Sequence, residues 1–460
     1  MKNLLTSLFF FSFIFSSNAQ SVPQKLDTLI SAYAKLNQFN GTILISKSGQ
    51  TIFEKAYGYR DAEKQIKVTT NDIFQLGSLT KSFTAVLVMK LVEEKKLSLN
   101  TRITTFFPAV HPEKEITIAQ LLSHTSGIRE ELRDAKFRAK VLSGKSINKQ
   151  EMLDYYAAAP LDFELGTAFS YSNSGYNLLG MVIEKLTGKS YGAAMQQFIF
   201  KPLGMNNSGF DYARLQSRLK TKGYSYLSST RIVPAKVWDA SGTYSSGGLY
   251  SNTKDLAVWN KALKENKLIS TAGLIKCYTP VKEDYGYGWF IDSLEHKKIA
   301  YHAGNVEGST SYFARIPEDD ICIIMLINHT STNIETIGSK IIALLYDKKY
   351  ILPKPKQSHE LTAEQAVKYV GQYDISDDYI TAISLKGNQL FIQTNNQPPV
   401  KMLAESSSRF FIDDSNMTLT FSNTAEGKIQ LSIRDGLWNG SGDKKIINNA
   451  PGVTAPIMYK

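Results

Sequence analysis

The feature that most constrains the fold of this chain is a nearly unbroken apolar stretch at residues 83–92. A helix of this composition has no polar face, so it must be buried on most of its sides. The stretch therefore predicts a central helix with other elements packed around it. Directly before it lies the pentad Gly77-Ser78-Leu79-Thr80-Lys81, which follows a strand-like run at residues 73–76.

Ser78 and Lys81 combine two groups that nucleophilic catalysis needs. Their spacing puts them on one face of the helix, one turn apart. A serine hydroxyl becomes a good nucleophile when a base takes its proton. A buried lysine can be that base because desolvation lowers its pKa. The N-terminus of the helix also offers free backbone N–H groups to a developing oxyanion.

The Ser-x-x-Lys spacing by itself is not specific. It occurs five times, at Ser78, Ser146, Ser217, Ser251 and Ser441. Ser78 alone precedes a helix that is predicted to be buried, whereas the other copies lie in polar, basic or turn segments or near the start of the helix that contains residues 255–259. The Ser78 copy is therefore the candidate nucleophile.

Two later segments supply further polar groups. Residues 169–175 are rich in turn formers and precede an amphipathic helix at 176–186. Within them, Tyr171 could pass a proton, and Asn173 could project the same way and donate a hydrogen bond. Residues 299–305 read as a strand that ends in small residues and contains His302, and small residues let a substrate backbone approach an edge strand.

In this order, the three segments resemble the serine β-lactamase and penicillin-binding-protein family, in its class C and DD-peptidase-like branch. The family pattern is Ser-x-x-Lys, then Tyr-x-Asn, then a Lys/His-x-Gly strand. Residues 122–127, 247–251 and 285–289 resemble the family as well, and the resemblance covers residues 22–350.

The resemblance implies a role for each matching residue. Ser78 would be acylated and then released by water, Lys81 and Tyr171 would share the acid–base work, and Asn173 would orient Lys81 and the substrate amide. The N–H groups of Ser78 and Asn305, beside Gly304, would form the oxyanion hole.

The third motif departs from the Lys-Thr-Gly form of the lactamases. His302 stands in place of the lysine and Ala303 in place of the threonine. The family uses those two groups to hold a substrate carboxylate. The departure favours a DD-peptidase, D-aminopeptidase or esterase over a β-lactamase. If His302 has its ordinary pKa, it should gain charge below about pH 6.5.

Composition and the N-terminus indicate an exported globular protein. Hydrophobic residues make up 43% of the chain and charged residues 21%. Lys2, the apolar run 4–15 and Ala19 read as a signal peptide cleaved after Ala19, so we expect a periplasmic or secreted protein without a transmembrane segment. The net charge of +11 comes from scattered residues, which argues against nucleic acid. The scattered histidines predict neither a metal nor another cofactor.

The patterning divides the chain into an α+β part and an all-β part. Strands near both ends of residues 20–350, with helices between them, predict one antiparallel sheet covered by helices. A proline- and lysine-rich linker at 351–360 follows. Short strands separated by turns at 361–460 predict a small barrel-like accessory domain, and residues 370–373 resemble the opening of lipocalin-like modules. The pairing of Cys277 with Cys322 stays open.

Two other functions are compatible with these residues. The first is a penicillin-binding-like sensor that binds wall peptides without hydrolysing them. The second is a structural or assembly role of the C-terminal module. The presence of Ser78, Lys81, Tyr171 and Asn173 together favours catalysis, because a pure binder does not need proton-transfer groups. The sequence leaves the substrate, its stereochemistry and the oligomeric state open.

Overall fold

The computed structural model describes residues 20–445 except 229–230, 331–333, 377–378, 395–397, 413–416 and 436–437. The expected signal peptide, residues 1–19, lies outside the described residues. Among the helices of the described part, none is both long and apolar enough to cross a membrane.

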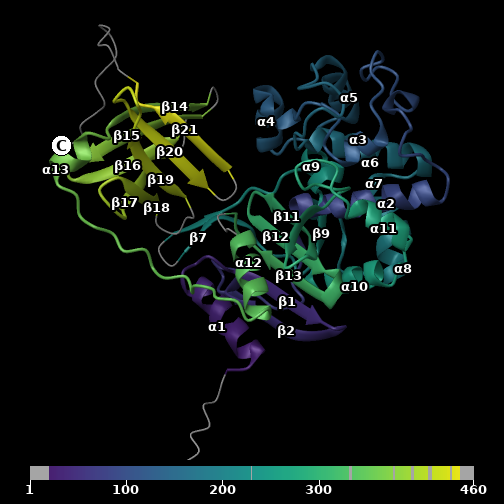
Figure 1. The fold of residues 1–460 in the computed structure, drawn as a ribbon, viewed down its shortest axis with the longest axis horizontal. Helices are drawn as coiled ribbons and strands as arrows, with labels where there is room; N and C mark the ends of the chain where they lie inside the picture. Colours follow the sequence, from purple (N-terminus) through teal and green to yellow (C-terminus); the bar gives the residue numbers. More distant parts are fainter. Residues whose placement is uncertain are drawn as a thin grey trace, which may run out of the picture.

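A six-stranded antiparallel sheet forms the centre of the N-terminal part, in the order β10-β11-β12-β13-β1-β2. The purple strands β1 and β2 lie beside the green strand β13 in Figure 1, so the sheet joins the beginning of this part to its end. The predicted sheet built from both ends is confirmed. Its strands are β1 (Gly41–Lys47), β2 (Gln50–Tyr57), β10 (Phe290–Leu294), β11 (Lys297–Val306), β12 (Ser309–Ile316) and β13 (Ile321–Ile327).

Helices cover both faces of this sheet, which explains why β13 is apolar at every position. Ile323 and Met325 belong to the core under α1 (Val22–Lys35) and α12 (Ile334–Leu345). Ile324 and Leu326 belong to the core on the opposite face, which contains α2 (Thr80–Glu93). Side chains of a strand alternate between faces, so a strand buried on both sides needs a continuous apolar run.

Helix α2 is buried as its composition predicted. Residues 80–89 and Leu91 are all buried, and Phe83 stacks on Trp259 of α10 (Thr253–Lys264) with ring centroids 4.1 Å apart. The one-turn helix η1 (Gly77–Leu79) precedes α2 and carries Ser78. The other helices of this part are α3 (Ile118–Leu122), α4 (Ala135–Leu142), α5 (Lys149–Ala158), α6 (Asn173–Thr187), α7 (Tyr191–Met195), α8 (Lys201–Leu203), α9 (Ala240–Gly247), α10 (Thr253–Lys264) and α11 (Thr271–Cys277).

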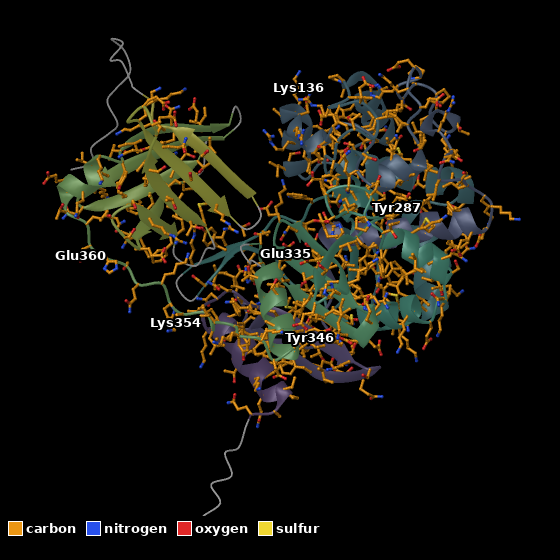
Figure 2. All side chains as sticks on the ribbon, in the orientation of Figure 1. Lys136, Tyr287, Glu335, Tyr346, Lys354 and Glu360 are labelled. Atoms are coloured by element: carbon orange, nitrogen blue, oxygen red, sulfur yellow. The ribbon has the colours of Figure 1, made fainter. Side chains whose placement is uncertain are left out.

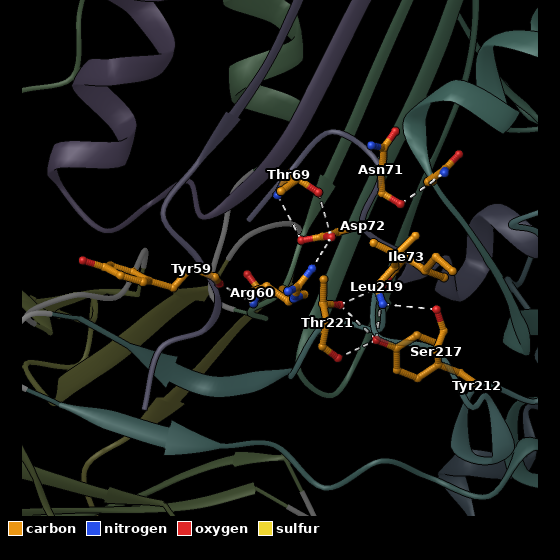
Figure 3. A network of polar contacts seen from close by, with 12 residues as sticks. Tyr59, Arg60, Thr69, Asn71, Asp72, Ile73, Tyr212, Ser217, Leu219 and Thr221 are labelled. Atoms are coloured by element: carbon orange, nitrogen blue, oxygen red, sulfur yellow. Dashed lines mark hydrogen bonds and ion pairs between the residues drawn. The ribbon is translucent and has the colours of Figure 1, made fainter. Parts of the chain in front are cut away.

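A polar network fixes the segment that leads into η1 (Figure 3). The buried carboxylate of Asp72 accepts hydrogen bonds from Arg60 at 2.8 Å and from the Thr69 hydroxyl at 2.9 Å. The Tyr212 and Thr221 hydroxyls both donate to the carbonyl of Ile73, at 3.2 and 2.9 Å. The chain therefore reaches Ser78 from a fixed direction.

The C-terminal strands form a separate antiparallel sheet in sequence order, from β14 to β21. The N–H of Lys445 donates to the carbonyl of Gln372, which brings the two ends of the sheet together into a nearly closed barrel. Its interior is a core of its own, drawn from residues 366–433. The strands are β14 (Gly371–Ser376), β15 (Tyr379–Lys386), β16 (Gln389–Thr394), β17 (Val400–Ala404), β18 (Arg409–Ile412), β19 (Thr418–Asn423), β20 (Ile429–Asp435) and β21 (Trp438–Asp443).

An extended segment connects the two parts. Between α12 and α13 (Ala363–Val367), the chain forms neither helix nor strand apart from a single bridge at His359. Lys354 and Glu360 mark this segment in Figure 2, where it runs along the outside of the molecule. The two cysteines are buried free thiols, Cys277 in α11 and Cys322 in β13.

We expect a chain that ends at Lys356 to fold and to retain the reactive serine, because the barrel has its own core beyond the extended segment. Circular dichroism, thermal unfolding and labelling with a fluorophosphonate probe would test the truncated chain against the full chain. An insoluble or unlabelled truncation beside a soluble, labelled full chain would show that the barrel is integral to the fold.

Candidate active site

The amine of Lys81 lies at the centre of a polar cluster beneath Ser78. Its Nζ is 3.3 Å from Ser78 Oγ, 2.7 Å from Asn173 Oδ1 and 2.9 Å from the carbonyl oxygen of Ser246. Ser78 is partly exposed, whereas Lys81 is fully buried. The cluster therefore joins η1, α2, α6 and α9 beneath a partly exposed serine.

Burial lowers the pKa of Lys81 to about 7, against the smaller opposing effects of the Glu130 and Glu131 carboxylates. An ammonium ion loses its hydration when it is buried, so the neutral amine is favoured. At neutral pH a large fraction of Lys81 is thus an uncharged amine, the form that can accept a proton.

Tyr171 lies beside the same two residues. Its hydroxyl shares a hydrogen bond with Ser78, and the Nζ of Lys81 is 4.6 Å from the centre of its ring. Burial raises the pKa of Tyr171 far above its ordinary value, so the hydroxyl keeps its proton at neutral pH. Aromatic side chains hold the ring: His124 lies 4.4 Å away between centroids, and Phe290 stacks at 6.4 Å.

Asn173 is the first residue of α6, and Glu130 holds both of its donor groups. Its backbone N–H donates to Glu130 Oε2 at 2.5 Å, and its Nδ2 donates to Glu130 Oε1 at 2.9 Å. The side-chain oxygen is left to face Lys81. The expectation that Asn173 reaches Lys81 agrees with this geometry, but one of its amide hydrogens is directed to Glu130.

A second carboxyl group lies deeper in the same place. Glu131 is 1% exposed and accepts hydrogen bonds from the hydroxyls of Tyr156 and Ser174 and from the Asn177 amide. Burial and the neighbouring Glu130 raise the pKa of Glu131. This network attaches α5 and α6 to the loop that carries Glu130.

Strand β11 passes close to η1, and two glycines make this approach possible. A Cβ placed on Gly77, whose φ is +53°, would lie 2.8 Å from the backbone nitrogen of Asn305. A Cβ on Gly304 would lie 1.9 Å from the Leu76 carbonyl oxygen. The Ser311 hydroxyl on β12 donates to that same oxygen at 2.6 Å and fixes the contact. The main chain of Asn305 therefore lies beside the start of η1.

His302 does not present a titratable face to a substrate at mildly acidic pH. It is 1% exposed, its Nδ1 donates to the carbonyl of Ala303 at 2.6 Å, and its Nε2 accepts from the Tyr285 hydroxyl at 3.2 Å. Burial, and then the nearby Lys81 charge, lower its pKa to about 3. The expectation that His302 gains charge below about pH 6.5 is therefore wrong. Ala303 packs on the core under α12, so the alternation of β11 directs it away from Ser78.

The sequence did not single out Glu130, His124 or the Ser246 carbonyl. Glu130 stood in an Arg-Glu-Glu run that reads as ordinary surface charge. The Ser246 carbonyl turns toward α2 after Tyr244, whose backbone has φ 33° and ψ −127°, a strained conformation. Of the other Ser-x-x-Lys serines, Ser251 is fully buried and hydrogen-bonded to Ser208 at 2.7 Å.

The described residues contain no group of three or more His, Cys, Asp or Glu side chains that could hold a metal ion. Ser78, Lys81 and Tyr171 bring together a hydroxyl, an amine and a phenol, groups that can transfer a proton from a hydroxyl and let it attack covalently.

Residues 26–345 match the Beta-lactamase family, which is most of the chain. The protein belongs to this family and is a serine hydrolase. Penicillin-binding protein 4* of Bacillus subtilis is 28% identical over 85% of this chain and 92% of its own length. Protein flp of Staphylococcus aureus is 29% identical over 67% of this chain, and the match covers 63% of protein flp.

Solved structures agree with this assignment. The octameric penicillin-binding protein homologue from Pyrococcus abyssi has a TM-score of 0.64 and 25% identity, over 91% of this chain and 99% of that one. The D-amino acid amidase from Ochrobactrum anthropi has a similar fold, with a TM-score of 0.59 and 22% identity over 71% of this chain and 97% of its own.

Proposed function

We propose that the protein is an exported hydrolase that cleaves a peptide, amide or ester through an acyl-enzyme on Ser78. The observation that supports this proposal best is the buried Lys81 amine, which contacts the hydroxyl of a partly exposed serine and has a pKa of about 7. A structural lysine gains nothing from such burial, whereas a general base needs it.

The lowered pKa of Lys81 and the raised pKa of Tyr171 assign the two residues different roles in proton transfer. Lys81, as the neutral amine, takes the proton of the Ser78 hydroxyl while Oγ attacks the substrate carbonyl carbon. Tyr171 stays protonated and lies within hydrogen-bond reach of Ser78, so it serves as the acid that protonates the leaving group. Its proton is replaced from Lys81. Water then attacks the acyl-enzyme by the reverse route.

The backbone N–H groups of Ser78 and Asn305 are proposed to stabilise the tetrahedral intermediate. The close approach of β11 to η1 at Gly77 and Gly304 supports this role. Two backbone donors fixed in advance stabilise developing negative charge without reorganising.

The substrate class follows from what His302 offers. As a neutral, buried ring, it gives no positive charge to a substrate carboxylate. We therefore propose peptide, amide or ester substrates of the DD-peptidase, D-aminopeptidase or esterase type and weak β-lactam turnover. The names of the similar proteins, a penicillin-binding protein and a D-amino acid amidase, are compatible with this range.

Export is proposed from the N-terminal segment, with cleavage after Ala19 and delivery to the periplasm or the medium. The all-β part, residues 361–460, is proposed as an accessory module of the hydrolase.

Replacing Ser78 with alanine should abolish covalent labelling by a fluorophosphonate probe and lower ester hydrolysis by several orders of magnitude, because the nucleophile and its base act as a unit. The melting temperature should stay close to that of the unchanged protein. Ser146→Ala, at an exposed copy of the same spacing, is the matched control and should label normally. Labelling with no turnover in the unchanged protein would instead favour the non-hydrolytic sensor.

The kcat/KM for a p-nitrophenyl ester should fall about tenfold per pH unit below pH 7, because Lys81 becomes protonated there and loses its lone pair. Lys81→Ala and Tyr171→Phe should each lower acylation by roughly 10²-fold or more. Their combined loss should be smaller than the product of the two, since both break one proton route. Multiplicative losses would argue against a shared route.

A chromogenic cephalosporin should be turned over poorly compared with a neutral ester, since a missing charged hydrogen bond costs about 1.5–3 kcal/mol, or roughly one to two powers of ten in binding. The ratio of the two kcat/KM values should stay constant from pH 8 to pH 5, because His302 remains neutral over this range. A ratio that rises toward low pH, or efficient cephalosporin turnover at high pH, would contradict this account of the third motif.

A further inference from the structure

The protonation of the Lys81 amine decides which of its three contacts it donates and which it accepts. An ammonium group has three N–H donors, whereas a neutral amine has two N–H groups and one lone pair. The two shorter contacts, to Asn173 Oδ1 at 2.7 Å and to the Ser246 carbonyl at 2.9 Å, are both to acceptors. They occupy the two hydrogens of the neutral amine. The lone pair is then left for the third direction, toward Ser78 Oγ at 3.3 Å.

This arrangement depends on which end of the Asn173 amide faces Lys81. With the amide reversed, Nδ2 would donate to the lone pair of Lys81. The two amine hydrogens would then point at the Ser246 carbonyl and at Ser78. The amine could no longer take the serine proton, although every residue would still be in place.

Glu130 decides the orientation of that amide. Its carboxylate accepts from both the backbone N–H and the Nδ2 of Asn173, and Oε1 also accepts from the N–H of Leu132 at 3.4 Å. A carboxylate has no hydrogen to donate, so it can pair only with the donor end of an amide. The side-chain oxygen must therefore face away from Glu130 and toward Lys81.

We propose that Glu130 is a positioning residue that sets the direction of proton transfer, by holding Asn173 so that the lone pair of Lys81 points at Ser78. This inference rests on the proposed acyl-enzyme function and adds a residue to it. It predicts that the hydrogen-bond polarity of the pair Glu130–Asn173 matters, and not merely the shape of the two side chains.

A swap of the two chemical groups tests this polarity. In Glu130→Gln, the amide of the new side chain can pair with a reversed Asn173, and kcat/KM for an ester should fall by tenfold or more, carried mainly by kcat. Asn173→Asp should lose activity to a similar degree, because two carboxylates then face each other. In the double variant, the amide introduced at position 130 donates to one oxygen of the carboxylate introduced at position 173. The other oxygen of that carboxylate accepts from Lys81, so most of the activity should return at a pH high enough to leave Lys81 neutral.

The pH profile gives a second readout that a structural role would not move. In the double variant, the negative charge lies directly against the amine, so the acid limb of kcat/KM should shift to higher pH than in the unchanged protein. The titratable groups that face Lys81 from the surrounding elements are Glu130 and Glu131, His124 and His302, and Tyr171 and Tyr176. The two histidines and the two tyrosines stay neutral near pH 7, so the carboxylate introduced at position 173 controls the shift.

Glu164→Gln is the matched control, since this exposed carboxylate pairs with Lys114 on the surface and should have no effect on activity. Thermal unfolding would verify that each variant is folded. If Glu130→Gln fails to fold, the comparison of Asn173→Asp with the double variant still decides the question. An active Glu130→Gln variant, or a double variant no better than Asn173→Asp, would overturn the proposal. Unchanged activity in Ser78→Ala would instead overturn the proposed function itself.

Discussion

The burial of one amine, that of Lys81, is the interaction on which the rest of the site depends. A shift of its pKa from 10.5 to about 7 corresponds to roughly 5 kcal/mol that disfavours the charged form. The fold can hold the amine there because neutral acceptors, Asn173 Oδ1 and the Ser246 carbonyl, satisfy it. The nearby side chains of Glu130 and Glu131 oppose the effect of burial and limit the lowering of the Lys81 pKa. The result is an amine whose neutral form, with a free lone pair, is well populated near neutral pH.

The architecture supplies this environment from segments that are far apart in the sequence. Helix α2 brings Lys81 into the core, α6 brings Asn173, and the strained turn at Tyr244 brings the Ser246 carbonyl. Strand β11 approaches η1 through two glycines and lines the other side of Ser78. The six-stranded sheet is built from strands at both ends of the N-terminal part, so no single segment can form the site by itself.

The third motif shows how the same strand can support different chemistry. In the lactamase pattern, position 302 is a lysine that holds a substrate carboxylate. Here a histidine at that position is enclosed by Tyr285 and Phe290 and bonded to a backbone carbonyl. The His302 ring is one of the rings that surround Tyr171. Enclosure in apolar surroundings, which also lowers its pKa, removes the histidine from charge recognition.

The sequence by itself determined the buried helix, the strands of both sheets in large part, and the order Ser78, Lys81, Tyr171, Asn173. These rest on local signals: an apolar run with no polar face, alternating strands bounded by turns, and short motifs. Only the tertiary structure decided the protonation of His302 and the roles of Glu130 and Ser246. A pKa depends on what surrounds a group in three dimensions, and a carboxylate in an Arg-Glu-Glu run looks the same whether it faces water or an active-site amide. A backbone carbonyl carries no sequence signal at all.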